Sequence, residues 1–320
     1  MDTPEYDPDR KRAFEERMFK ELLTDRRHQR RLAYMKYGVI AVLGFSYLCA
    51  LLVGLLRSDE QTKPVPDGYV AMVRIEGEIG PGKAASAEKL NPLLEKAFSD
   101  ANAKGIILQV NSPGGTPVQS ALINDRIRQL KAQYPDKKVV AVASDMMTSG
   151  AYFISVAADR IVVNRSTIAG SIGVITRGFG FQGLMDKLGV ERRVLTAGES
   201  KNMMDPFGPQ SPEDRLKQAE LLSAIHKHFI DAVKQGRGAR LKLDTPGLFS
   251  GTVWTGEQAV ANGLADELGD VQAAAAKNFG TKTIHEYAPR KGLLESLVSG
   301  VSVQVSEMLR PQVEGPVLLP

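Results

Sequence analysis

The chain has 320 residues, which is enough for one large domain or two modest ones. Hydrophobic residues make up 43% of it and charged residues 24%, as in an ordinary globular protein with a sizeable core. The net charge of +4 is small for this length and the basic residues do not gather on one face, so we expect no nucleic-acid partner. The single cysteine, Cys49, excludes an intramolecular disulfide and argues against a cysteine-based metal site or nucleophile.

The first 56 residues have the pattern of a membrane anchor behind a charged tail. Residues 1–36 alternate charges densely, which is typical of a solvated tail or a short surface helix. Residues 37–56 carry no charge, and 20 residues is about the length of helix that crosses a bilayer core. A buried helix of a globular protein is the alternative, but such a helix usually has a polar stripe, which this segment lacks.

A cleaved signal peptide is a second alternative for this segment. The 36 residues ahead of it exceed a usual signal-peptide n-region, and no small-x-small cleavage pattern follows, so an uncleaved signal anchor fits better. Basic residues crowd its N-terminal flank, among them Arg26, Arg27, Arg30, Arg31 and Lys36. The positive-inside rule then leaves the N-terminus in the cytoplasm. In a bacterium we expect the remaining chain beyond the inner membrane, in the periplasm or outside the cell.

After a linker at 57–68, marked by proline and glycine, strand and helix patterns alternate. We expect strands at 69–77, 105–111, 138–144 and 160–164 and around 172–176, and helices at 86–102, 117–133, 149–158 and 211–236, followed by a short helix and strand within 254–269. The strands are nearly continuous β-branched runs, which is typical of a parallel sheet covered by helices on both faces. The sequence thus predicts an α/β domain at 69–290 and an amphipathic or disordered tail at 291–320.

A double glycine follows the strand predicted at 105–111, in the run Asn-Ser-Pro-Gly-Gly that ends with Gly114 and Gly115. Glycines adopt backbone conformations closed to other residues, so their N–H groups can point at an oxyanion that develops in a reaction. A tight turn without a ligand is the alternative, but the position after a buried strand favours the oxyanion interpretation. The motif of a phosphate-binding loop is absent.

Ser149 stands between the strand predicted at 138–144 and a helix, in the run Thr-Ser-Gly-Ala-Tyr. Unpaired N–H groups at the start of a helix stabilise an anionic transition state, so a serine there is a candidate nucleophile. Serine is also a preferred N-cap residue, which would give Ser149 a purely structural role. The full Gly-x-Ser-x-Gly signature of α/β-hydrolases is not met.

A serine nucleophile needs a base, and Lys201 is the candidate. It lies in a loop of glycine, apolar residues and proline, which is an unusual setting for a surface lysine. A lysine amine is a poor base at its ordinary pKa of about 10.4, but desolvation lowers that pKa and lets an amine accept a serine proton. Ser171, in the run Ala-Gly-Ser-Ile-Gly, could orient the amine by a hydrogen bond or could be an ordinary turn serine.

The four histidines do not recommend another site. We expect His226 and His228 on the surface of the long helix at 211–236, His28 on the cytoplasmic side, and His285 after a strand near the C-terminus. None has the companions of a metal ligand, as in His-Glu-x-x-His, so no metal or other cofactor is expected. Sequence distance does not exclude a Ser-His-Asp triad, but no histidine lies near a serine turn in the sequence.

Six motifs resemble, in this order, those of signal peptide peptidases of the SppA type, a Ser-Lys family of membrane-bound bacterial proteases (family S49). They are NSPGG at 111–115, SGAY at 149–152, AAD at 157–159, GSIGVI at 170–175, GESKNM at 198–203 and GTVWTGEQAVANGLADELG at 251–269. The resemblance covers about residues 70–275 and is to the short, single-copy form. It implies a crotonase/Clp-like α/β fold.

The resemblance also implies roles for six residues. They are the nucleophile Ser149, the general base Lys201, the lysine-holding Ser171, and an oxyanion hole from the N–H groups of Gly150 and of Gly114 or Gly115. Relatives assemble as homo-oligomeric rings, octameric in the short form, and neighbouring protomers can share one site. A single protomer would then be inactive.

We therefore expect a membrane-anchored serine endopeptidase with a Ser-Lys dyad that hydrolyses hydrophobic peptides, such as cleaved signal peptides. One alternative is a SohB-like membrane peptidase that acts on folded or misfolded proteins. A second is a non-catalytic membrane scaffold of the same fold, which a serine-reactive phosphonate would fail to label at Ser149. A crotonase-type acyl-CoA enzyme is disfavoured by the expected external location.

Overall fold

A computed structural model of the chain describes residues 34–52 and 68–288. The chain divides into two compact units, residues 65–290 and the two terminal segments 1–64 and 291–320. In the second of these, the helix Tyr34–Leu52 has a mean hydropathy of 1.7, so by length and composition it is suited to cross a membrane. The predictions for residues 1–33, for 53–67 with the linker, and for the tail at 291–320 fall outside the described residues.

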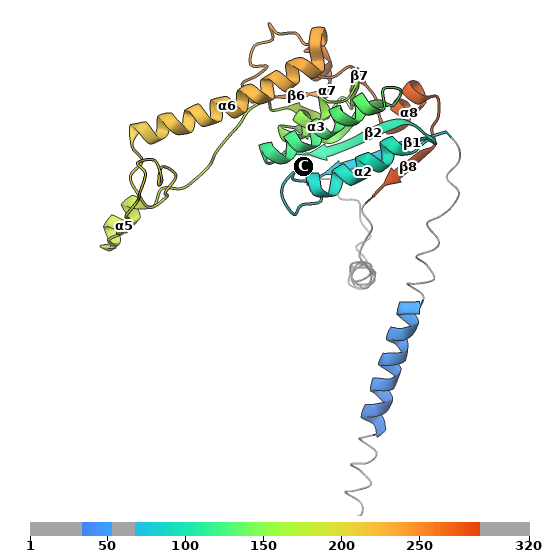
Figure 1. Cartoon of the computed structure of the whole chain (residues 1–320), viewed down its shortest axis with the longest axis horizontal. Coiled ribbons are helices and arrows are strands. Elements are labelled where there is room, and N and C mark those ends of the chain that lie inside the picture. Colours follow the sequence, from blue (N-terminus) through green and yellow to red (C-terminus); the bar gives the residue numbers. More distant parts are fainter. Residues whose placement is uncertain (1–33, 53–67, 289–320) are drawn as a thin grey trace, which may run out of the picture. The chain divides into compact units, whose positions relative to one another are not determined.

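The unit at 65–290 is built on one sheet of eight strands (Figure 1). The strands are β1 (Tyr69–Glu76), β2 (Ala103–Ser112), β3 (Lys138–Thr148), β4 (Arg160–Val163), β5 (Ile168–Gly170), β6 (Val253–Thr255), β7 (Glu267–Leu268) and β8 (Ile284–Tyr287). The main path runs β6-β5-β3-β2-β1-β8, with β4 pairing with β3 and β7. Every pairing is parallel except that of β5 with β6. The predicted parallel α/β fold is confirmed.

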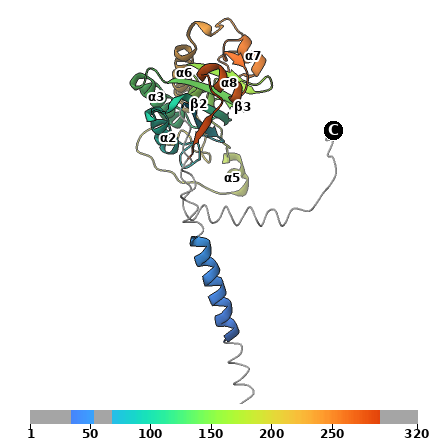
Figure 2. The same cartoon turned by 90° about the vertical axis from the view of Figure 1, so that its right-hand side faces the viewer.

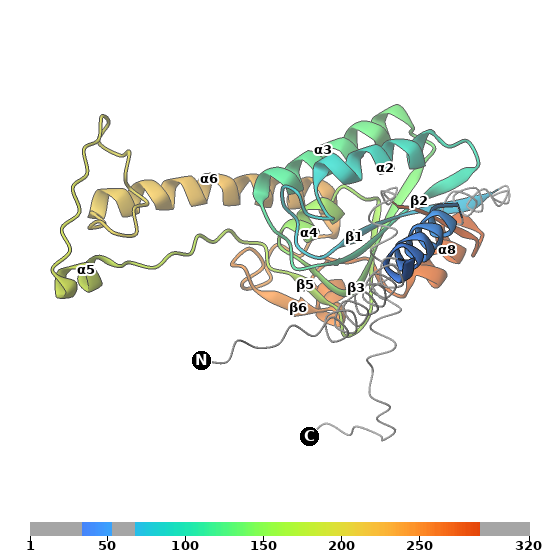
Figure 3. The ribbon, with the colours of Figure 1, turned by 90° about the horizontal axis from the view of Figure 1, so that it is seen from below.

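Helices cover both faces of this sheet because successive strand residues alternate between two apolar layers. In β1, Ala71 and Val73 face one layer, whereas Val70 and Met72 face the other. The helices are α2 (Ala87–Ser99), α3 (Pro117–Gln133), α4 (Gly150–Ser155), α5 (Gln182–Leu188), α6 (Pro212–Arg237), α7 (Gly256–Ala261) and α8 (Val271–Phe279), with a 3-10 turn at Gly238–Arg240. Figure 3 shows α2, α3 and α4 on one face, and α8 packs on the other, against β2 and β3 (Figures 2 and 3).

Three sequence predictions need correction. The strand predicted around 172–176 is wrong, because the strand is β5, four residues earlier, and Val174 and Ile175 lie half-buried and exposed beyond it. The helix predicted at 149–158 is shorter, since α4 ends at Ser155. His285 lies within β8 itself and not after the strand expected near the C-terminus, and α5 and α8 were not predicted.

The helix α6 extends from the sheet and carries a long exposed segment at its N-terminal end. A capping box between Ser211 and Asp214 begins this 26-residue helix. Its buried residues are near its C-terminal end, from Phe229 to Arg237, so its N-terminal half has no core to cover. Residues 174–211, which we call the arm, run from the sheet after β5 to that N-terminal end and include α5, which lies away from the sheet (Figures 1 and 3).

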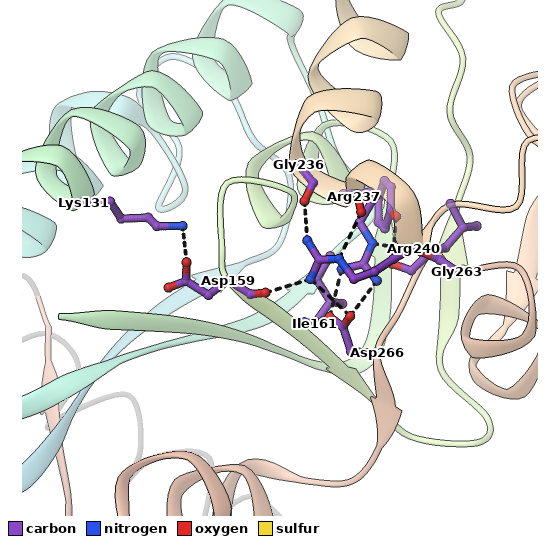
Figure 4. Close-up of polar contacts among 10 residues, drawn as sticks. Lys131, Asp159, Ile161, Gly236, Arg237, Arg240, Gly263 and Asp266 are labelled. Atoms are coloured by element: carbon purple, nitrogen blue, oxygen red, sulfur yellow. Dashed lines mark hydrogen bonds and ion pairs between the residues drawn. The ribbon is translucent and has the colours of Figure 1, made fainter. Parts of the chain in front are cut away.

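A buried ion pair fixes the C-terminal end of α6 (Figure 4). Arg237, with its side chain 1% exposed, forms two hydrogen bonds of 2.8 and 2.9 Å with the carboxylate of Asp266. The Arg237 Nε donates to the Gly263 carbonyl, and Arg240 reaches the same carboxylate at 3.2 Å. Asp266 also accepts from the Ile161 amide, at the second residue of β4. The base of α6 is therefore tied directly to the sheet.

Replacing Asp266 by Asn should destabilise the fold strongly, because it leaves the Arg237 guanidinium buried without a counter-charge. We expect the free energy of unfolding to fall by about 3 kcal/mol. Chemical denaturation of the full chain in detergent, followed by circular dichroism, measures this. Asp231→Asn is the matched control, since it breaks the exposed Lys227–Asp231 pair and should leave the unfolding midpoint nearly unchanged. Equal midpoints for the two variants would contradict a stabilising role of the Arg237–Asp266 ion pair.

The same carboxylate predicts how stability depends on pH. Burial alone would raise the pKa of Asp266, but hydrogen bonds from Arg237 and Ile161 and the charges of both arginines hold that pKa below its ordinary value. Such a group stabilises the fold above its unfolded pKa of about 3.9, and the stabilisation is lost as the pH falls through the folded pKa. Between about pH 5 and pH 3, the parent should lose more stability than Asp266→Asn, as thermal unfolding at each pH would measure. Parallel losses in both proteins would contradict this assignment.

Candidate active site

Ser149 lies in a strained turn between β3 and α4. Its φ of +53° and ψ of −125° differ from the extended conformation of an N-cap residue, and its side chain makes no capping hydrogen bond. The backbone is held on both sides, since its N–H donates to the Gly170 carbonyl (2.8 Å) and its carbonyl accepts from the Phe153 N–H (2.9 Å). The side chain of Ser149 therefore does not cap the helix, which was the purely structural role that the sequence also allowed.

Ser171 repeats this geometry on the neighbouring strand. Thr148 at the end of β3 pairs in parallel with Gly170 at the end of β5, so the serine that follows each strand stands beside the other. Neighbouring strands are about 4.8 Å apart, which sets the spacing of the two turns. Ser171 has a φ of +51°, and its N–H donates to the Thr252 carbonyl at 2.9 Å.

Ser149 and Ser171 are the only non-glycine residues with positive φ in the part of the chain that the structure describes. A side chain in that region of φ and ψ costs of order 1–3 kcal/mol, and such residues persist where the surrounding structure holds them. Strain of this kind gathers at active sites and ligand clamps. Its occurrence at two adjacent serines makes this edge of the sheet the candidate functional site.

The double glycine after β2 packs directly against Ser149. A Cβ on Gly114, whose φ is +97°, would lie 2.6 Å from the Gly150 nitrogen and 2.7 Å from the Ser149 Cβ. A Cβ on Gly150 would lie 3.2 Å from the Gly115 nitrogen. Only glycine therefore permits this approach of the two loops. The sequence predicted that these glycines meet a reacting group, and the structure brings all three to the nucleophile candidate.

The three glycine amides are not equivalent. The Gly114 N–H donates to the Ser112 hydroxyl at 3.1 Å, in a buried position. Among the described residues, no acceptor takes the N–H of Gly115 or of Gly150. Two unused donors beside a serine are the composition of an oxyanion hole. Because Gly114 has no side chain, the two loops can approach each other closely. The N–H groups of Gly115 and Gly150 are the available hydrogen-bond donors.

Lys201 is not brought to Ser149 within one chain. It is exposed and lies in the arm, between α5 and α6. Gln218 near the start of α6 holds this part of the arm through the Met203 carbonyl, whereas His226, eight residues further along α6, contacts the turn that contains Ser171. These two points are roughly 12 Å apart by the rise of an α-helix. The buried setting expected for this lysine is absent from the single chain.

His226 is a site neighbour that sequence reasoning missed. We expected it on the surface of α6, away from any serine turn, but it is half-buried and its Nε2 lies 3.1 Å from the carbonyl oxygen of Ile172, the residue after Ser171. His228 is exposed, as expected, and meets the Phe153 ring edge-on. No feature of the helical pattern distinguishes the two histidines, since they are only two positions apart.

Two other features lie away from these turns. Within the described ranges, no group of three or more His, Cys, Asp or Glu residues could hold a metal ion. A cavity of about 390 Å³ is lined by Lys131, Lys138, Asp159 and Arg160, at the amino ends of β3 and β4. Ser149 follows the carboxyl end of β3, so the cavity lies at the opposite edge of the sheet.

Comparison with known proteins identifies the family to which this chain belongs. The model of peptidase family S49 matches residues 131–283. A proposed protease of Methanocaldococcus jannaschii is 30% identical over 241 residues, which cover 72% of this chain and 76% of that protein. The chain belongs to peptidase family S49. The matched residues contain Ser149, Ser171 and Lys201 of this S49 chain.

Other relatives are longer than this S49 chain. The Na(+)/H(+) antiporter NhaA of Brucella melitensis is 43% identical over 242 residues, which are 73% of this chain and 32% of that protein. A candidate signal peptide peptidase SppA of Enterococcus faecium is 35% identical over 179 residues, 55% of this chain and 50% of that protein. The chain thus spans a third to a half of the length of these relatives.

Among solved structures, the membrane-bound stomatin-specific protease 1510-N, in a lysine-to-alanine variant with a substrate peptide, matches with a TM-score of 0.43 and 17% identity. The match covers 74% of this S49 chain and 99% of that chain. A serine-to-alanine variant of the same protease matches with a TM-score of 0.40.

Gly114→Ala should displace the turn at Ser149 and lower the reactivity of this serine. The added methyl group would meet backbone atoms of Thr148 and Gly150 at 2.8 and 2.6 Å, which cannot move without displacing Ser149. We expect labelling of Ser149 by a serine-reactive phosphonate to slow by roughly a hundredfold, as for a 1 Å misplacement of a reacting group. Gly82→Ala is the control, because Gly82 also has a positive φ (+73°) but no atom near its Cβ position. Equal labelling rates in both variants would contradict this packing argument.

Proposed function

We propose that this chain is a serine endopeptidase in which Ser149 is the nucleophile and Lys201 of a second copy is the general base. The observation that carries this proposal is the paired strain at Ser149 and Ser171, together with two unused amide donors beside Ser149. Membership of a peptidase family supports the same chemistry. None of the steps proposed below needs a cofactor.

The proposed reaction is acyl transfer by covalent catalysis. The Ser149 Oγ attacks the carbonyl carbon of the scissile peptide bond while its proton passes to the amine of Lys201. The N–H groups of Gly115 and Gly150 donate to the resulting oxyanion. The lysine then gives the proton to the leaving amine, and water releases the acyl group by the same steps in reverse. Ser171 accepts a hydrogen bond from the lysine and directs it toward Ser149.

A second copy of the chain is needed because one copy holds the serine and the lysine apart. The arm supports this arrangement, since it exposes large apolar side chains that include Phe179, Leu188 and Leu195. A segment that exposes several large apolar side chains is a candidate interaction site. We propose a homo-oligomer, a closed ring in its complete form, in which the arm of one copy covers the serine turns of the next. Docking would also remove water from the amine, which a lysine base requires.

The proposed substrates are hydrophobic peptides at a membrane, such as cleaved signal peptides. The helix Tyr34–Leu52 has the length and composition of an anchor, and the Enterococcus faecium relative is named as a signal peptide peptidase, which supports the same substrates. With basic residues on its N-terminal flank, the anchor would leave the catalytic unit on the periplasmic or extracellular side of a bacterial inner membrane. Casein against a synthetic signal peptide separates this function from that of a SohB-like peptidase.

The antiporter name of the Brucella relative does not carry over to this chain. Ion antiporters are built from many membrane-crossing helices. The described residues contain one helix with the length and composition to cross a membrane. The match covers only 32% of the Brucella protein, which leaves most of that protein to account for its name.

Complementation between two inactive variants tests the shared site. Ser149→Ala and Lys201→Ala should each abolish hydrolysis of a hydrophobic reporter peptide, because one lacks the nucleophile and the other the base. Co-expression of the two should restore part of the activity, since some sites then combine an intact serine from one copy with an intact lysine from another. Lys187→Ala, at an exposed lysine of α5, is the matched control and should keep full activity.

The outcomes separate the two parts of the proposal. Parent-like turnover by either single variant would refute the Ser-Lys assignment. Inactive single variants without complementation would refute the shared site and place both groups in one copy. Failure of a serine-reactive phosphonate to modify Ser149 of the parent, checked by intact mass, would favour a non-catalytic scaffold.

A further inference from the structure

The Ser171 turn is held from two directions. On one side, the loop before β6 supplies two backbone hydrogen bonds, from the Ser171 N–H to the Thr252 carbonyl (2.9 Å) and from the Gly251 N–H to the Ile172 carbonyl (3.1 Å). On the other side, His226 of α6 approaches the same Ile172 carbonyl, with its Nε2 at 3.1 Å. A carbonyl oxygen has two lone pairs, so it can accept from both donors.

The chemistry of this contact fixes the tautomer of His226. A carbonyl oxygen only accepts, so the Nε2 of the imidazole carries the hydrogen and donates it. The side chain is half-buried, while the next residue, Lys227, is exposed. Near it, Phe229 packs against Phe153 of α4 with ring centroids 5.1 Å apart. The helix therefore touches the α4 side of the site by apolar packing and the Ser171 side by a directed hydrogen bond.

This hydrogen bond acts where the backbone is strained. Ser171, at a φ of +51°, needs external contacts to stay in its conformation, and the Ile172 carbonyl is one peptide unit away. Losing one donor would free the turn to relax, which would move the Ser171 hydroxyl. The buried apolar contacts of α6 would persist, because they do not depend on the imidazole.

We propose that His226 is a positioning residue that sets the Ser171 hydroxyl by donating from Nε2 to the Ile172 carbonyl. This inference rests on the proposed function, because the hydroxyl matters through the lysine that it orients. His226 also lies on the helix that carries the arm, so the same contact fixes the position of α6 relative to the serine turns. It does not itself touch the reacting atoms.

A series of substitutions at His226 tests the directed bond. His226→Gln keeps an N–H donor at the position of Nε2, whereas His226→Phe keeps the ring and removes the donor. We expect His226→Phe to lower kcat of the full-length assembled protein by roughly tenfold, the size of one lost hydrogen bond in the transition state, with KM unchanged. His226→Gln should keep kcat within about twofold of the parent. His228→Phe, two residues along the same helix, is the matched control and should keep the parent kcat.

A second pair of variants covers the case in which His226→Phe fails to fold or assemble. Asn and Gln carry the same amide, but Asn is one carbon shorter and does not reach the Ile172 carbonyl. His226→Asn should therefore lose activity while His226→Gln keeps it, with equal thermal unfolding temperatures. Equal kcat for the Gln, Asn and Phe variants would overturn the inference, whether the common value is high or low. Ser149→Ala, run in parallel, must be inactive, since activity in that variant would mean that the proposed function itself has failed.

Discussion

The site depends on one short parallel pairing, of Met146–Thr148 in β3 with Ile168–Gly170 in β5. Both strands end at the same level, so the residue after each strand must turn away at the same place. In both cases that residue is a serine with a left-handed φ near +50°. The Ser149 N–H donates to the Gly170 carbonyl, which ties one turn to the end of the other strand. The geometry of one serine therefore cannot change without disturbing the other.

The remainder of the unit is arranged around this edge of the sheet. The double glycine after β2 approaches because neither residue has a side chain to block it. The helix α4 is held by the Asn124 amide, which donates to the Phe153 carbonyl, and by the buried Tyr152 hydroxyl, which donates to the Leu264 carbonyl. The Arg237–Asp266 ion pair fixes the C-terminal end of α6, and the hydrogen bond of His226 fixes the middle of this helix. Two separate contacts along one helix determine a direction as well as a position.

The sequence was sufficient for the longer elements whose apolar residues belong to the core. The helix predicted at 117–133 is found as Pro117–Gln133, and the strands β1 to β4 were predicted because their residues are buried on both faces of the sheet. It was misleading where apolar residues lie outside the core. Val174 and Ile175 look like a strand, but they belong to the exposed arm, where side chains of this kind have no core partner in the same chain. Backbone strain at Ser149 and the contact of His226 were not predictable, because both arise from packing between distant segments.

The long reach of α6 has a consequence for the life of the protein. In a newly made copy, the lysine lies toward the N-terminal end of the 26-residue helix α6 and the serine lies beside the middle of that helix, so under the proposed shared site the copy is harmless to its neighbours. Hydrolysis would begin only after copies have met. For chains confined to a bilayer, the onset would then follow their surface density more steeply than linearly. The separation of the serine from the lysine in one copy would then keep the protein inactive until it assembles, as a removable propeptide does in other hydrolases.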